Sequence, residues 1–193
     1  MSVRALYQQK RMSAADAVRV ARNGETIIVP TAVGEPPTLL AALSGQRRDF
    51  RDVRVAQILA LRKFDYFDPE TVDNVRHEAY FFSGASRPGG QAGWIDYLPA
   101  YFSELPGLIA RNMIPADVVF TMASPMDEHG FFSLSLATDY TMAAVERARA
   151  VVLEVNPNVP FANGDCHVHI SQVTALCESE DPIFALAQRG DLR

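Results

Sequence analysis

The apolar positions of the chain follow two different spacings. Six short runs are nearly continuous in Val, Ile and other apolar residues, which predicts strands buried on both faces. They are residues 26–30, 53–60, 79–84, 117–124, 151–156 and 173–178. Four other segments, residues 13–22, 38–45, 102–113 and 139–150, have the apolar spacing or the end signals of short helices. Strands that alternate with helices predict an α/β fold: a layered, mostly parallel open sheet flanked by helices.

The expected helix ends carry suitable residues. Ser13 and Asp139 stand where an N-cap is needed, and Pro106 fits only the first turn of its helix. Gly24 and Gly45 mark the ends of the first two helices. No internal repeat or low-complexity segment interrupts the series, so residues 1–193 are expected to form one domain.

Composition and charge narrow the class of protein. The chain is 48% hydrophobic and 21% charged, as in an ordinary soluble domain with its own core. Its net charge of −5 is uneven: residues 1–63 carry +6 and the remainder carries −11. The arginines of the basic third are scattered, which fits a phosphorylated ligand or an acidic partner better than nucleic acid.

The two cysteines, Cys166 and Cys177, form no CxxC motif. With no secretory leader, this predicts neither a zinc ribbon nor a disulfide framework, and it favours a reducing cytoplasm. The chain has no run of about 18 apolar residues, so no membrane span is expected.

Candidate binding loops follow from the fold class, because open parallel sheets bind ligands at the carboxyl ends of their strands. These loops are residues 31–36, 59–63, 83–87 and 123–127. In the first loop, backbone N–H groups near Glu35 and Thr38 can receive an anion or a carbonyl oxygen. The alternative is a tight strand-to-helix turn in which Gly34 serves only the geometry.

The glycine-rich stretch SGASRPGGQAG, residues 83–93, has neither the Walker nor the dinucleotide-binding pattern. It is expected to be a flexible loop in which Arg87 clamps a carboxylate or a phosphate through its bidentate fork. The alternative is a solvated arginine.

Histidines and acidic residues offer three further candidates. His167 and His169 lie on one face of an expected strand, which makes an incomplete metal site; a hydrogen-bonded pair is the preferred interpretation, and no metal is predicted. His77 is expected at a strand edge. The sequence Asp127-Glu128-His129 suggests acid-base chemistry, but neighbours on an extended segment point to opposite faces, which favours a polar turn.

Several large apolar residues near this turn are expected to belong to the core. They are Met122, Met126, Phe131, Phe132 and Met142.

Three separated motifs resemble those of a known family. They are GEPPTLLAAL at 34–43, FFSGASRPGGQAGWIDYLPAYFSELP at 81–106, and SPMDEHGFFSLSLATDYTMAAVERARAVVLEVNPNVP at 124–160. In this order they resemble the amino-terminal domain of the acetyl-CoA hydrolase and 4-hydroxybutyrate CoA-transferase family, and the resemblance runs from Leu6 to Ile183. One departure is Gln91, which stands where the family usually has asparagine.

The resemblance implies that residues 1–193 are the amino-terminal half of an enzyme with two related α/β domains. Such enzymes move CoA between an acyl-CoA and a small carboxylic acid, of the 4-hydroxybutyrate or acetate type, through a glutamyl-CoA thioester. Hydrolysis differs only in whether water reaches that thioester. The glutamate nucleophile belongs to the carboxyl-terminal domain, so no catalytic residue is expected in this chain.

The resemblance also implies which residues of this half line the site. The expected substrate-binding residues, on the side that faces the missing domain, are Thr31, Gly34, Glu35, Pro36, Ser86 and Arg87. Coenzyme A is expected as a substrate, with no permanently bound cofactor, and a homo-oligomer is expected. Three interpretations of the half-length chain stay open: a fragment, one subunit of a split enzyme, or a free-standing domain that binds an acyl-CoA or a carboxylate without turnover.

Overall fold

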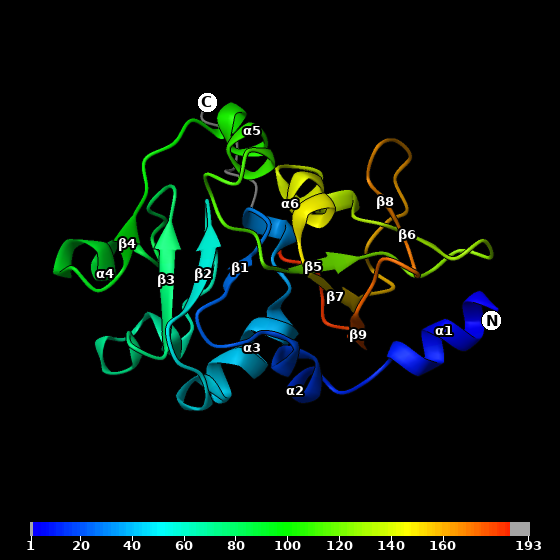
Figure 1. The fold of residues 1–193 in the computed structure, drawn as a ribbon, viewed down its shortest axis with the longest axis horizontal. Coiled ribbons are helices and arrows are strands. Elements are labelled where there is room, and N and C mark those ends of the chain that lie inside the picture. The colour runs from blue at the N-terminus through cyan, green and yellow to red at the C-terminus, as the bar shows by residue number, and fades with distance from the viewer. Residues whose placement is uncertain (1, 186–193) are drawn as a thin grey trace, which may run out of the picture.

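The structure is a computed structural model that describes residues 2–185. A seven-stranded sheet forms its centre, in the order β4-β3-β2-β1-β5-β7-β9, and every neighbouring pair is parallel (Figure 1). The strands are β1 (Thr26–Ile28), β2 (Val53–Gln57), β3 (Val75–Ala79), β4 (Asp96–Tyr97), β5 (Val118–Ala123), β7 (Ala150–Val155) and β9 (Ala175–Glu178). The predicted layered, mostly parallel α/β fold is confirmed.

Helices cover both faces of the sheet, and successive strand residues alternate between the two layers. In β1, Ile27 packs into the cluster under α2 (Ala14–Ala17) and α3 (Pro37–Gly45). Its neighbour Ile28 packs into the opposite cluster under α5 (Leu105–Ala110) and α6 (Thr141–Arg147). Both side chains are fully buried, which explains why the strands appear as continuous apolar runs.

The remaining elements surround this three-layer core. Strands β6 (Phe131–Ser133) and β8 (His167–His169) form a separate antiparallel pair. Helix α1 (Val3–Lys10) lies at the β9 end of the sheet and α4 (Arg87–Ala92) lies beyond β4 at the other (Figure 1). Short 3-10 turns occupy Val18–Val20, Ala32–Gly34, Arg47–Asp49, Asp65–Phe67, Pro69–Thr71, Phe102–Glu104 and Ser135–Ala137.

The strand order reverses next to β1. The chain adds β2, β3 and β4 on one side of β1, and then β5, β7 and β9 on the other. This reversal places a topological switch point between β1 and β5, where open α/β sheets leave room for a ligand at the carboxyl edge. Residues 31–36 follow β1 at that edge, and residues 124–127 follow β5.

One expected strand is misplaced. The strand predicted over 79–84 lies earlier in the chain, at β3 (Val75–Ala79). The residues of β3, VRHEA, alternate between buried and half-buried positions, and the strand ends at Ala79. Phe81, past the strand end, is 57% exposed. Likewise, His77 is in the middle of the strand and 1% exposed, so its predicted position at a strand edge is wrong.

Other boundaries differ for local reasons. The helix predicted over 139–150 is shorter, Thr141–Arg147, since β7 already begins at Ala150. The glycine-rich loop contains a helical turn, α4, which ends at Gly93 with a φ of 88°. Phe132 is buried as expected, whereas Phe131 is 38% exposed and lies outside the core. Within the described residues, no helix is long and apolar enough to cross a membrane.

Candidate functional site

The first and third motifs meet at the carboxyl edge of the sheet. A Cβ atom on Gly34 would lie 2.9 Å from the carbonyl oxygen of Leu136 and 3.1 Å from the Cα of Ala137. The two backbones therefore touch, and only a glycine leaves room for that approach. Asp139 strengthens the junction, because its Oδ2 accepts a 2.8 Å hydrogen bond from the backbone N–H of Thr31.

Tyr140 joins the same motif to the ends of β1 and β2. Its hydroxyl donates to the carbonyl oxygen of Val29 at 2.6 Å and accepts from the backbone N–H of Ile58 at 3.2 Å. The ring is 1% exposed. A hydrogen bond in a dry interior is costly to break, so this contact holds the two strand ends in a fixed relation.

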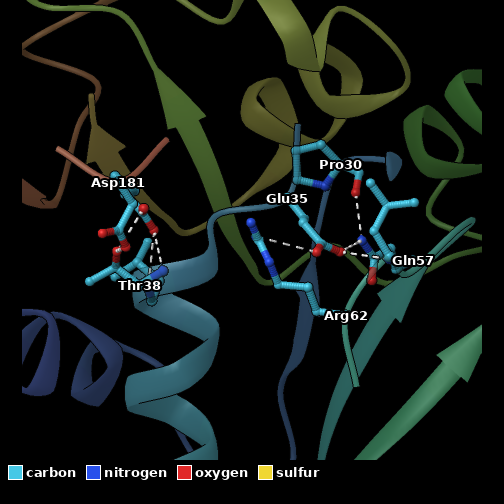
Figure 2. Close-up of polar contacts among 9 residues, drawn as sticks. Pro30, Glu35, Thr38, Gln57, Arg62 and Asp181 are labelled. Atoms are coloured by element: carbon cyan, nitrogen blue, oxygen red, sulfur yellow. Dashed lines mark hydrogen bonds and ion pairs between the residues drawn. The ribbon is translucent and has the colours of Figure 1, made fainter. Parts of the chain in front are cut away.

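Glu35 is the centre of a second buried contact network (Figure 2). Its Oε2 accepts hydrogen bonds from Gln57 Nε2 and from the backbone N–H of Leu61, both at 3.1 Å. Gln57 Nε2 also donates to the carbonyl oxygen of Pro30 at 2.9 Å. The loop after β2 is thereby fastened to the loop after β1.

The other carboxylate oxygen of Glu35 is less well satisfied. Among the described residues, Oε1 accepts no hydrogen bond, and its ion-pair partner is Nη1 of Arg62 at 3.6 Å. Burial raises the pKa of Glu35, although the hydrogen bonds from Leu61 and Gln57 and the charge of Arg62 oppose this shift. With 1% exposure, Glu35 is poorly placed to attack a bulky thioester.

The amino end of α3 is already occupied by an anion from within the protein. Glu154 of β7 accepts hydrogen bonds from the backbone N–H and the hydroxyl of Thr38, both at 2.8 Å, and from the backbone N–H of Leu39 at 3.1 Å. The carboxylate is fully buried, and this burial raises its pKa. Of the two interpretations of this loop, an external anion on the N–H groups near Thr38 is therefore contradicted, and the tight strand-to-helix turn is supported.

Ser86 and Arg87 lie after β3. The Ser86 hydroxyl is fully buried; it accepts from the backbone N–H of Ser83 at 3.0 Å and lies 3.2 Å from the Ser83 hydroxyl, which closes the turn. Arg87 is exposed, and its Nη2 donates to the carbonyl oxygen of Phe82 at 3.3 Å. The structure places Thr31, Gly34, Glu35 and Pro36 after β1 and Ser86 and Arg87 after β3, and the substrate-binding roles of all six remain predictions.

The turn at residues 127–130 forms as predicted. Asp127 Oδ1 accepts from the backbone N–H groups of His129 and Phe131 at 2.9 and 2.7 Å, and Gly130 has a φ of 93°. Glu128 and His129 are exposed, with side-chain exposures of 86% and 74%. These residues close the turn between β5 and β6.

The remaining histidines are structural. His167 and His169 on β8 form hydrogen bonds to the Ala162 carbonyl oxygen and the Ser171 hydroxyl at 2.9 and 2.8 Å, so each ring is hydrogen-bonded as predicted, through a different partner. Burial lowers the pKa of His77 to about 3, and its ring stacks on Phe67 with centroids 4.3 Å apart. Residues 2–185 contain no group of three or more His, Cys, Asp or Glu side chains suited to a metal ion.

Sequence reasoning missed three polar residues of this site: Gln57, Arg62 and Glu154. Gln57 and Glu154 share a recognisable signal, since each is a polar residue near the carboxyl end of a strand in which most residues are apolar. Such a residue must find hydrogen-bond partners in the interior, which makes it a candidate for a site at the strand end. Arg62 was not named individually, although it lies in the loop 59–63 that the fold class predicts as a candidate binding loop.

Large apolar side chains are exposed near β4. They are Phe81, Tyr97, Leu98, Tyr101 and Phe102, with exposures between 40% and 77%. Exposed apolar side chains of this kind are common where another protein surface docks.

Comparisons with known proteins agree with this geometry. Residues 1–187 match the family model of the acetyl-CoA hydrolase/transferase N-terminal domain. The chain is 40% identical over 180 residues to succinyl-CoA:cyclohexane-1-carboxylate CoA transferase of Geobacter metallireducens, with 93% of this chain and 41% of the relative covered. It is 32% identical over 181 residues to 4-hydroxybutyrate coenzyme A transferase of Clostridium kluyveri, with 94% and 42% covered.

Two solved structures also match nearly all of this chain over less than half of their own length. The crystal structure of RipA from Yersinia pestis superposes with a TM-score of 0.91 at 29% identity, over 100% of this chain and 47% of that one. A 4-hydroxybutyrate CoA-transferase from Porphyromonas gingivalis gives a TM-score of 0.74 at 26% identity, over 95% and 42%.

The chain belongs to the acetyl-CoA hydrolase/transferase family, as its N-terminal domain. It spans less than half the length of these relatives.

Proposed function

We propose that this chain is the amino-terminal half of a CoA-transferase that moves CoA between an acyl-CoA and a small carboxylic acid. The observation that carries the proposal is the convergence of the first and third family motifs at the carboxyl edge, through Gly34, Asp139 and Tyr140. A sheet edge made rigid in this way is suited to holding a substrate in place.

The chemistry is divided between two halves in this proposal. A glutamate of the carboxyl-terminal half attacks the thioester carbonyl of the acyl-CoA and expels CoA thiolate, which leaves a mixed anhydride. The thiolate then attacks the glutamyl carbonyl of this anhydride, which forms glutamyl-CoA and releases the first carboxylic acid. The acceptor carboxylate then reverses the sequence. Residues 31–36 supply one wall of the acyl pocket, and the deep burial of Glu35 supports a structural role for this carboxylate.

Assembly and location form part of the same proposal. The exposed apolar side chains in and around β4 suit contact with the second half or with another subunit in a homo-oligomer. Both cysteines are free and buried, which suits a cytoplasmic protein.

The proposal is tested by mixing butyryl-CoA and acetate with this chain alone, and again together with a carboxyl-terminal half of the same protein. New acetyl-CoA is measured by chromatography. Transfer is expected only when both halves are present.

Three outcomes would contradict the proposal in different ways. Transfer by residues 1–193 alone would mean that the site is complete within this chain. Release of free CoA without an acceptor would favour an acyl-CoA hydrolase, which the family name also covers. Binding of butyryl-CoA without any turnover in the presence of both halves would favour a non-catalytic binding domain.

A further inference from the structure

A groove beside Glu35 has one cationic side chain among its described lining residues. The groove measures about 720 Å³ and lies between the amino end of α3, the loop after β2 and residues 181–185. Among the lining residues within 2–185, Arg62 is the only Lys or Arg. Apolar side chains, including Phe64, Ile183 and Phe184, cover much of the remaining wall.

The guanidinium of Arg62 retains unused hydrogen-bonding capacity. Its Nη1 lies 3.6 Å from Glu35 Oε1, which is an ion pair beyond ordinary hydrogen-bond length. The side chain is 32% exposed, and its Cζ lies 5.7 Å from the ring centroid of Phe184. Among residues 2–185 the guanidinium forms no hydrogen bond, although it carries five N–H donors.

Two competing anion sites are less suitable. The N–H groups at the amino end of α3 are taken by Glu154. Arg87 lies at the start of α4, is exposed, and donates to the carbonyl oxygen of Phe82. Of these three candidates, Arg62 is therefore the half-buried cation that remains available to an anion near the topological switch point.

We propose that Arg62 binds the carboxylate of the acid substrate and that the groove selects apolar monocarboxylates. This inference rests on the proposed function, because it names the acid that the transferase accepts. The carboxylate lies on the guanidinium fork, and the alkyl chain lies along Phe64 and Phe184. Asp181 on the same groove repels a second carboxylate, so a dicarboxylate such as succinate binds less well.

Glu35 is a positioning residue in this arrangement. Its buried Oε1 faces the guanidinium, and its Oε2 is fixed by Gln57 and Leu61 (Figure 2). Figure 2 also shows the guanidinium on the side of Glu35 that faces Thr38 and Asp181. The long 3.6 Å contact holds Arg62 in place and leaves its other N–H groups available to a ligand.

The test measures the binding of butyrate and succinate to the full-length protein by NMR titration, in the absence of CoA. Arg62→Gln is expected to weaken butyrate binding by roughly 10- to 100-fold, since a charge-assisted hydrogen-bond pair is lost. The butyrate affinity of Arg62→Lys is expected to lie between those of the unmodified protein and Arg62→Gln, because lysine retains the charge and lacks the guanidinium fork. The matched control is Arg48→Gln, an exposed arginine paired with Glu70 at 3.4 Å, for which no change is expected.

The Asp181→Asn variant tests the selectivity. It is expected to improve succinate binding by about threefold or more and to leave butyrate binding unchanged. Thermal unfolding of each variant establishes that it is folded, and Arg62→Lys keeps the test valid if Arg62→Gln does not fold.

Several results would overturn the inference. These are wild-type butyrate affinity in both Arg62 variants, loss of affinity in Arg87→Gln in their place, or tighter binding of succinate than of butyrate by the unmodified protein. Because binding is measured without turnover, loss of butyrate binding in Arg62→Gln together with no CoA transfer by the unmodified full-length protein would refute the proposed function alone. Transfer with an unchanged butyrate KM in Arg62→Gln would refute only this inference.

Discussion

Replacing Glu154 by alanine removes the anion that caps α3. Three hydrogen bonds are lost, and the backbone N–H groups of Thr38 and Leu39 remain without a partner. An unsatisfied buried donor costs roughly 1 to 3 kcal/mol, and Leu39 is fully buried while Thr38 is half-buried. Including the loss of the favourable helix-dipole interaction, the free energy of unfolding is expected to fall by about 3 to 5 kcal/mol.

This change is measured by urea unfolding followed by far-UV circular dichroism. At roughly 2 to 4 °C per kcal/mol for a chain of this size, the melting temperature should fall by about 10 °C. Glu154→Gln retains an acceptor for both N–H groups and should cost less than half as much. The control is Glu128→Ala, because that side chain is 86% exposed and forms an exposed ion pair with His129 at 3.6 Å. If Glu154→Ala destabilised the protein no more than Glu128→Ala, the capping argument would be refuted.

Two further predictions concern stability. Burial raises the pKa of Glu35, Asp139 and Glu154, so the folded state holds protons on these carboxyl groups more tightly than the unfolded chain does. The contribution of these groups to the free energy of unfolding should therefore fall as pH rises from about 4.5 toward neutrality. A urea series from about pH 4.5 to 7.5 measures this slope; Glu154→Gln should make it shallower, and a rise in stability across the window would contradict the sign. Gly34→Ala, whose Cβ would lie 2.9 Å from a carbonyl oxygen, should cost about 1 to 3 kcal/mol by urea unfolding, whereas Gly45→Ala, with nothing within 4 Å, should cost nothing. Equal stabilities of the two glycine variants would show that the contact at Gly34 is easily relieved.

Much of the architecture was predictable because the strands are buried on both faces. Runs such as 117–124 and 151–156 allow few alternatives to a central strand, and β5 and β7 lie within one residue of them. The strand predicted over 79–84 was misplaced for the opposite reason, a weak apolar signal in the true strand. Strand β3 lies near the sheet edge and contains the polar residues Arg76 and Glu78, so its apolar signal is weaker than that of the aromatic residues that follow it.

The site was only partly predictable. The first loop and its glycine were identified by their place between a strand and a helix, and Gly34 indeed lies against another backbone. The partners of this loop could not be found, since Gln57, Glu154 and Asp139 reach it from 22 to 116 positions away along the chain. Nothing in local periodicity indicates which distant polar side chain fills a given buried space.

By itself, the sequence determined the layered α/β class, the position of most elements, and the family to which the chain belongs. These features depend on local spacing and on motifs that can be recognised in order along the chain. Only the tertiary structure decided that the α3 amino end is closed by Glu154 and that Arg62 lies beside Glu35. The physical reason is that a buried charge must find its partner in space, and the strand order determines which residues are brought close enough to provide one.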